Sequence, residues 1–437
     1  MRLLTAICVA ALVVAFAVPA FAETQNVKVA GEIKAFFVYQ NDIDLNSNDA
    51  EDNQNSFMQQ TNVSVEADLT DNVSTYVRIL NERDWNAETT SAQHFDVLLD
   101  EAYVTLREML YAPLTVKVGR QNIWLGKGFV VGNAGALLWN NSSDLPSTIR
   151  ELSEMTAFDA ARATLDYDPW TVDLIYSKID ANNDEKGDDV DLYVVNVGYD
   201  FTKYDAEAEM YYILKWDRSD IDAAKDTNVI NTVGIRGSLI PYDSMNLWGE
   251  VAVQFGQYRT STRSSDREAF ALDLGGDYTF ADVKWVPKLG LEFVYWSGEK
   301  AEQTGDWKAW DSLYPGKFDT YIAAFRNITK ITNYGIQLDG SDNGMTNELQ
   351  AAVIGGLSPM TDVNIDARWT YIWFDESPVA SASDDLGWEL DCKVTYDYTE
   401  DVLFFASAGL FAPESFYPAD QGDDNATQIL SGIKVDF

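Results

Sequence analysis

The sequence predicts an all-β protein, a transmembrane antiparallel β-barrel of about 18 strands in an outer membrane. Three observations lead to this prediction. Apolar and polar residues alternate along most of the chain, the connections between these segments sort into short and long ones, and the chain ends on an alternating segment that finishes in Phe437. A soluble β-sandwich gives no reason for such sorting, whereas outer-membrane barrels have short periplasmic turns and long extracellular loops.

The first residues predict a secretory signal peptide. Arg2 is followed by an apolar run that ends in Ala20-Phe21-Ala22, a small-x-small cleavage pattern. We therefore expect residues 1–22 to be removed and residues 23–437 to form a single barrel domain. The alternative, an N-terminal membrane anchor, fits this pattern less well, because a polar segment follows the cleavage site.

Composition excludes several classes of protein. With 31 basic and 70 acidic residues the net charge is −39, which repels nucleic acid. An aromatic content of 13% indicates a folded chain rather than an acidic disordered one. His94 is the single histidine and Cys392 the single cysteine after the signal peptide, so we expect no internal disulfide, metal site or cofactor.

Period-two alternation locates the strands. In residues 361–375, for example, Ile365 and Trp369 share one face while Asp366 and Arg368 share the other. The same alternation of apolar and polar residues predicts strands at 27–40, 56–69, 73–84, 95–108, 114–124, 158–167, 171–180, 189–201, 205–216, 229–240, 245–258, 267–280, 287–298, 345–357, 361–375, 385–398, 402–412 and 425–437.

The connections and the chain end set the orientation of the barrel. An even strand count places both termini at the periplasmic side, with the short turns. The long acidic loops then lie outside; they are near 41–55, 125–157, 181–189, 217–228, 259–266, 299–344 and 414–424. The last strand pairs with the first in a closed barrel, so Phe437 lies at the periplasmic rim.

Charges within strands are expected to face the lumen, because Arg or Lys on the lipid face costs about 2–4 kcal/mol at mid-bilayer. The lumen and solute-path residues predicted by this rule are Arg78, Arg107, Lys117, Arg120, Arg162, Arg236, Arg368, Glu101, Asp166 and Asp366. Two interpretations stay open. The arginines form a charge ladder for anionic or zwitterionic solutes, or they pair with the acids and brace the wall.

Aromatic residues gather at strand ends, which indicates girdles at the two membrane interfaces. The residues concerned are Tyr39, Trp85, Trp124, Trp170, Trp216, Trp248, Trp285, Trp296 and Tyr398.

Two motifs carry a resemblance to a known family. The stretch PLTVKVGRQNIWLGKGFVVG (113–132) resembles the L-x-x-G-R-Q-x-x-x-x-G-x-G segment of alginate-export-type outer-membrane porins, and DSLYPGKF (311–318) resembles their D-x-L-(F/Y)-P loop. The resemblance implies an 18-stranded barrel that passes anionic uronate polymer. Separately, Phe437 at the end of an alternating last strand resembles the signal that bacterial outer-membrane proteins present to the barrel assembly machinery.

The function we expect is an outer-membrane channel for passive diffusion or export of small or polymeric polar solutes, leaning toward anionic or acidic-sugar substrates. Its partners would be outer-membrane lipid, lipopolysaccharide, the assembly machinery and the solute. Two alternatives remain: a barrel that sheaths a multihaem cytochrome, which needs a lumen clear of inward loops, and an outer-membrane enzyme using His94. We expect no enzymatic activity, because His94 has no companion motif.

Overall fold

The computed structural model describes residues 26–43, 45, 53–85, 97–134, 152–180, 189–218, 228–259, 264–300, 305–323, 345–377, 382–417 and 424–437. Its first nine strands are β1 (Asn26–Asn41), β2 (Asn53–Thr70), β3 (Val73–Asp84), β4 (Leu98–Leu106), β5 (Leu114–Gln121), β6 (Phe158–Asp166), β7 (Trp170–Asp180), β8 (Val190–Phe201) and β9 (Ala206–Asp217). The second nine are β10 (Asn228–Tyr242), β11 (Met245–Arg259), β12 (Ser264–Thr279), β13 (Lys288–Trp296), β14 (Glu348–Met360), β15 (Val363–Phe374), β16 (Asp385–Asp397), β17 (Val402–Pro413) and β18 (Ala426–Asp436). A short 3₁₀ turn, η3 (Thr202–Tyr204), links β8 to β9.

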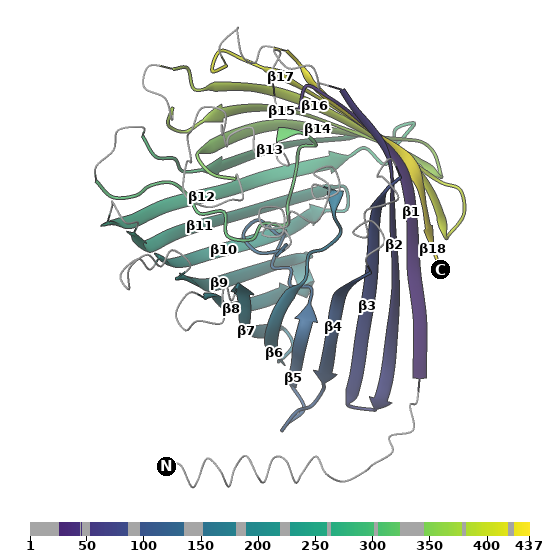
Figure 1. The fold of residues 1–437 in the computed structure, drawn as a ribbon, viewed down its shortest axis with the longest axis vertical. Coiled ribbons are helices and arrows are strands. Elements are labelled where there is room, and N and C mark those ends of the chain that lie inside the picture. Colours follow the sequence, from purple (N-terminus) through teal and green to yellow (C-terminus); the bar gives the residue numbers. More distant parts are fainter. Residues whose placement is uncertain are drawn as a thin grey trace.

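The strands close into one barrel (Figure 1). Each strand pairs antiparallel with its neighbours in the chain, and β1 pairs with β18 from Glu32 opposite Asp436 to Asn41 opposite Thr427. The predicted fold class and strand count are confirmed, and the predicted bounds agree within three residues. Closure leaves no free sheet edge, which is a requirement for a sheet that crosses a membrane.

The connections are sorted as predicted. Those at the end of the barrel that carries the chain termini are short; they span 71–72, 107–113, 167–169, 202–205, 243–244, 280–287, 361–362 and 398–401. At the other end the connections reach from 122 to 157 and from 297 to 347. By the general rule for these barrels, the short turns face the periplasm.

The two faces of the wall differ in chemistry. Val29, Val65, Val104 and Val118 are exposed on the outer face, where lipid covers them in a membrane. Their neighbours in the strands point inward. Among the described residues, no helix is long and apolar enough to cross a membrane.

The aromatic girdle is partly as predicted. Trp85, Trp170 and Trp285 are about half exposed, at 50%, 50% and 49%. The prediction is wrong for three others, however. Trp248 and Trp296 share the inward face of their strands with Glu250 and Val294, and Trp124 belongs to the loop after β5. The parity of the strand, rather than its end, decides which face a tryptophan occupies.

The chain end completes the barrel seam. The Phe437 N–H donates to the Gly31 carbonyl at 2.9 Å, and the Gly31 N–H donates to the Phe437 carbonyl at 2.8 Å. The Phe437 ring lies over Gly31, where a side chain on residue 31 would collide with it. The terminal residue therefore forms the last rung of the β1–β18 ladder.

Candidate functional site: the constricted lumen

Two segments from the long-loop end fold into the barrel and meet there. They are residues 122–134, which follow β5, and 305–323, which follow β13 (Figure 1). The Gly132 N–H donates to the Tyr314 carbonyl at 2.8 Å, the Tyr314 N–H to the Val130 carbonyl at 3.1 Å, and the Gly316 N–H to the Gly128 carbonyl at 2.8 Å. We call this pair of segments the inner plug. It comes from the two motifs that carry the family resemblance.

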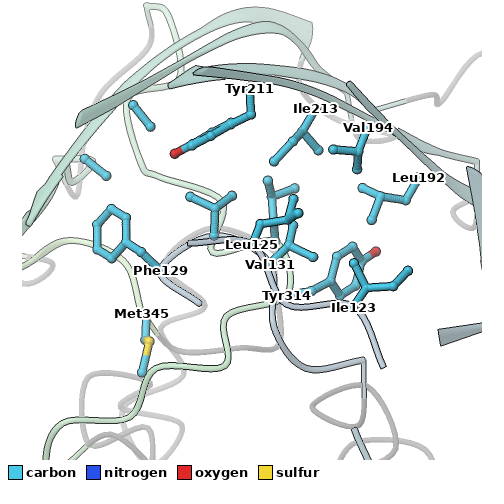
Figure 2. Packing of buried hydrophobic residues seen from close by; sticks show 14 of the residues in the cluster. Ile123, Leu125, Phe129, Val131, Leu192, Val194, Tyr211, Ile213, Tyr314 and Met345 are labelled. Atoms are coloured by element: carbon cyan, nitrogen blue, oxygen red, sulfur yellow. The ribbon is translucent and has the colours of Figure 1, made fainter. Parts of the chain in front are cut away.

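Apolar packing holds the inner plug against the wall. Ile123, Leu125, Val131 and Tyr314 of the plug contact inward residues of the strands, such as Ile213 (Figure 2). The interiors of large barrels are usually polar. Here the wall of β6 to β13 carries an apolar patch because the plug covers it. Fully burying one large apolar side chain is worth about 1.5–3 kcal/mol, so several together fix the plug in place.

Two glycines let the chain turn into the lumen. Gly126 and Gly128 have φ of +57° and +75°, values that non-glycine residues rarely adopt. This explains the G-x-G of the first motif.

The GRQ part of that motif fixes the end of β5. The Arg120 side chain donates to the Asp100 carbonyl at 2.9 Å and to the Asp159 carboxylate at 3.2 Å. The buried Gln121 amide donates to the Ala160 carbonyl at 3.0 Å. Arg120 therefore ties β5 to β4 and β6 just before the chain enters the lumen. The lumen prediction is wrong for Arg120, because it shares strand parity with the outward-facing Val118 and lies opposite the exposed Asp159.

The second motif docks through Asp311. Its carboxylate accepts from Lys215 at 3.2 Å and from the Leu313 N–H at 2.9 Å, while the Asp311 backbone exchanges two hydrogen bonds with the Gln254 side chain. Burial alone would raise the pKa of Asp311, but Lys215 and Arg267 lower it below its usual value. Asp311 stays ionised and paired.

Lys317 is the centre of a buried ion cluster. Its amine lies 2.5 Å from Asp273, 2.6 Å from Glu292 and 3.0 Å from Asp319. Arg368 joins the same cluster, 2.7 Å from Glu292. Burial alone would lower the pKa of Lys317, but the three carboxylates raise it above the ordinary lysine value. The cluster links the plug to β12, β13 and β15.

Lys127 differs from these cations. It lies 3.4 Å above the centre of the Trp248 ring, a cation–π contact, and within the described ranges no carboxylate pairs with it. Burial, and then the nearby charge of Lys317, lower its pKa. Lys127 thus offers a positive charge in the narrowed part of the lumen that no carboxylate contacts among the described residues, although Asp273 and Glu292 attract it from a distance.

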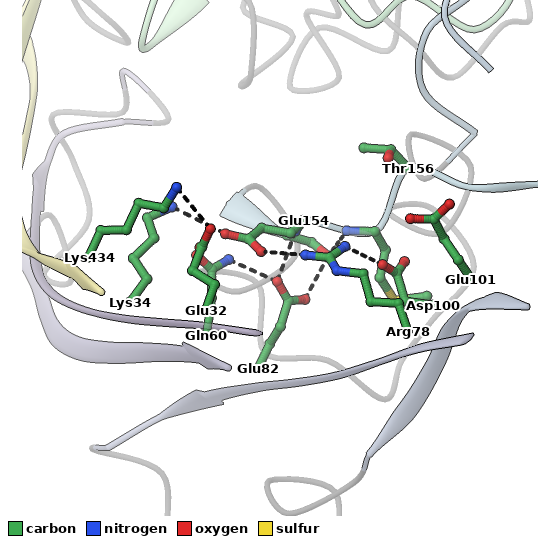
Figure 3. A network of polar contacts seen from close by, with 12 residues as sticks. Glu32, Lys34, Gln60, Arg78, Glu82, Asp100, Glu101, Glu154, Thr156 and Lys434 are labelled. Atoms are coloured by element: carbon green, nitrogen blue, oxygen red, sulfur yellow. Dashed lines mark hydrogen bonds and ion pairs between the residues drawn. The ribbon is translucent and has the colours of Figure 1, made fainter. Parts of the chain in front are cut away.

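A second polar network connects the four strands β1, β2, β3 and β4 to residues 152–156 (Figure 3). Arg78 pairs with Asp100 and lies 3.1 Å from Glu154, which is 3.6 Å from Lys34. Glu82 accepts from the Ser153 hydroxyl at 2.7 Å and from the Glu154 N–H at 2.8 Å. A β-bulge opposite Arg78 places Asp100 and Glu101 side by side, both buried, and so brings two acids to this network.

Another acid anchors the far end of the plug. The Glu389 carboxylate is fully buried and accepts from the backbone N–H groups of Tyr321, Ile322 and Ala323 at 2.8, 2.7 and 2.9 Å.

The remaining predicted residues occupy three environments. Arg162 forms a two-point pair with Asp173, with both contacts at 2.8 Å, and Arg236 lies 2.5 Å from Glu207 and 2.6 Å from Glu209. Glu101 accepts from the Asn122 side chain at 3.2 Å, and Asp366 lies 3.3 Å from Lys288. Asp166, Arg107 and Lys117 line a cavity near the short turns. Arg107 lies in the turn after β4, not in the strand as predicted, because β4 ends at Leu106.

Five of the predicted arginines, Arg78, Arg120, Arg162, Arg236 and Arg368, are therefore paired with carboxylates. These contacts fit the interpretation that they brace the wall. His94 and much of the acidic loops near 41–55 and 181–189 lie outside the described residues.

Sequence reasoning missed the lysines of the inner plug. Lys127 and Lys317 lie in loops, where alternation gives no information about direction. A signal was present nonetheless: both follow a glycine within the two motifs, as GKGF and GKF. No group of His, Cys, Asp and Glu in the described part of the chain is arranged to hold a metal ion.

A family model described as alginate export matches residues 25–427. The chain belongs to the alginate export family. No curated protein sequence matches it. Solved structures show the same fold: OpdL of Pseudomonas aeruginosa (11% identity, 94% of this chain and 99% of that one, TM-score 0.59) and OccAB1 of Acinetobacter baumannii (13%, 96% and 99%, 0.57). A third is OccK2 of Pseudomonas aeruginosa in complex with glucuronate (10%, 95% and 98%, 0.57).

Family and fold together place the protein in the outer membrane as a channel of the porin type. It contacts membrane lipid on its outer face and solute in its lumen.

Proposed function

We propose that this alginate export family member is a passive diffusion channel for small polar solutes that favours anions, acidic sugars among them. The carrying observation is the accessibility of its unpaired cations. Lys117 and Lys127 are partly exposed and Arg107 is exposed, and within the described part of the chain none of them pairs with a carboxylate.

The acids of the lumen are distributed differently. Glu82, Glu101, Glu250, Glu389 and Asp391 have exposed fractions of 4, 7, 5, 0 and 4%. Covered acids are withdrawn from the solute path. Asp166 and Asp366 remain exposed near the short turns, and Glu66 and Glu207, each paired with a cation, are partly exposed. In a narrow, partly desolvated passage a close charge outweighs distant ones that salt screens. The local cations therefore dominate over the net charge of −39.

The glucuronate complex of OccK2 supports the idea that a barrel of this architecture accepts an acidic sugar. The sheath alternative is less favourable, because it requires a clear lumen and the inner plug packs inside this barrel. An enzyme based on His94 gains no support from the described residues. Lipopolysaccharide and the barrel assembly machinery remain expected partners.

Liposome swelling tests the proposal. Proteoliposomes are diluted into isosmotic glucuronate, glucose or glucosamine, and we expect permeation in the order glucuronate, glucose, glucosamine. Lys127→Gln should reduce the advantage of glucuronate over glucose. Lys300→Gln is a matched control, because Lys300 is 64% exposed and pairs with Glu376 at 3.4 Å. Fastest entry of glucosamine, or no swelling with any sugar, would refute the proposal.

A further inference from the structure

A cavity of about 400 Å³ opens on the lumen side of the wall near the short turns, away from the inner plug. Its lining includes Tyr76, Tyr103, Thr105, Arg107, Lys117 and Arg162, contributed by neighbouring strands from β3 to β6 and by the turn after β4. This volume lies within the range typical of small-molecule sites, roughly 300–1,000 Å³.

The charges of this cavity are not equivalent. Arg162 forms an ion pair with Asp173, which also accepts a hydrogen bond from the Thr164 hydroxyl at 2.5 Å. Of the two acids in the lining, Glu66 lies 3.6 Å from Lys28, and Asp166 is at the end of β6. Arg107 and Lys117 have no carboxylate partner among the residues that the structure describes. Two cations, Arg107 from the turn after β4 and Lys117 from β5, are thus free to bind an anion.

Aromatic rings and hydroxyls complete the lining. The rings of Tyr76 and Tyr103 stack at 5.1 Å with an angle of 21°, and the Lys117 amine lies 4.3 Å from the centre of the Tyr103 ring. Thr105 and Thr115 line the same space. Rings offer an apolar surface to the C–H face of a sugar, hydroxyls hydrogen-bond its hydroxyls, and charge-assisted contacts to a carboxylate are the strongest of the set.

From this combination we propose that the cavity is a capture site for one carboxylated sugar unit on the periplasmic side of the channel. The carboxylate of the sugar lies between Arg107 and Lys117, and the sugar ring packs against Tyr76 and Tyr103. The inference rests on the proposed function and adds a location and a side to it. A solute arriving from the short-turn side meets this site before the inner plug, whereas one arriving from the loop side meets the plug first.

Single-channel recording tests the sidedness. Glucuronate added on the short-turn side should interrupt the current at lower concentration than glucuronate added on the loop side. Leu110, which is 88% exposed in the turn after β4, reports orientation. A Leu110→Cys variant in a Cys392→Ala background, labelled with biotin, binds streptavidin only on the side that this turn faces.

Variants test the residues. Arg107→Gln and Lys117→Gln should each weaken the block by about tenfold or more, since a hydrogen bond to a charged group is worth about 1.5–3 kcal/mol. Lys288→Gln is the matched control: this lysine also lies at the short-turn end, but it is already paired with Asp366 at 3.3 Å. Glucose should not block any of these channels.

Calorimetric titration of glucuronate into detergent-solubilised protein separates this inference from the proposed function. Binding that Lys117→Gln weakens tenfold supports the capture site even if no current is observed. Open channels without binding, with equal block from both sides, or with block unchanged in both variants overturn the capture site and leave the channel function intact. Heat-modified migration on gels verifies that each variant barrel is folded.

Discussion

Replacing Lys317 with methionine should release the inner plug. The change keeps an unbranched side chain up to Cε but removes the amine that contacts Asp273, Glu292 and Asp319 at 2.5–3.0 Å. Removing one partner of a buried ion pair costs about 3–5 kcal/mol, because the remaining charges stay buried without compensation. Arg368 retains its contact with Glu292, so the lower end of this range applies.

A cost of about 3 kcal/mol corresponds to roughly a 100-fold shift of the local equilibrium between docked and released plug. Hydrogen exchange measures this shift directly at the amides of Tyr314 and Gly316, which donate to Val130 and Gly128 across the plug. Both should exchange up to about 100-fold faster in Lys317→Met. Single-channel current should also become larger and noisier.

Lys300→Met is the control for this experiment, since its pair with Glu376 is solvent-exposed and such pairs contribute about 0–1 kcal/mol. If Lys317→Met leaves both amides as protected as in the unchanged protein, the ion cluster does not hold the plug in place.

The roles of Lys127, Glu389 and Phe437 can each be tested. Anion preference should decline as pH rises toward 10. Burial and the charge of Lys317 lower the pKa of Lys127, so Lys127 loses its charge below the ordinary lysine pKa of about 10.4. The pKa of Lys317 is raised, so Lys317 keeps its charge and the plug should stay docked at this pH. A reversal potential that is constant up to pH 10 would contradict this. Glu389→Gln should speed hydrogen exchange of the Ile322 amide by about tenfold or more, since an amide oxygen replaces a carboxylate acceptor. Glu400→Gln, in an exposed turn, should leave this exchange unchanged. Equal exchange rates in both variants would show that Glu389 does not anchor the plug. Deleting Phe437 removes the last rung of the β1–β18 ladder and should lower the yield of heat-modifiable barrel; an unchanged yield would rule out a role in assembly.

The fold was predictable because every strand must satisfy two different environments at once. Lipid outside and charges inside impose a period of two, and Val65 beside Glu66 or Arg368 beside Trp369 shows that pattern without tertiary information. The same logic applied to Trp248 and Trp296 would have placed them inside, since they share parity with Glu250 and Glu292.

The plug was not predictable in the same way. Lys127, Asp311 and Lys317 lie in loops, whose direction depends on backbone turns such as those at Gly126 and on contacts with strands far away in the chain. Alternation also places Arg162 and Arg236 inward, but it does not say whether each meets a solute or a carboxylate on a neighbouring strand. Here both meet carboxylates.

Unpaired lumen cations are proposed to set the selectivity of this channel, and the reversal potential of single channels in a KCl gradient measures that selectivity. We expect the reversal potential to show anion preference near physiological ionic strength, about 0.15 M. The preference should be weaker at low salt, where the acidic outer loops are less screened. Lys127→Gln should move the potential toward cation preference. A strong cation preference in the unchanged protein, or no shift in the variant, would mean that these cations do not set the selectivity of the channel.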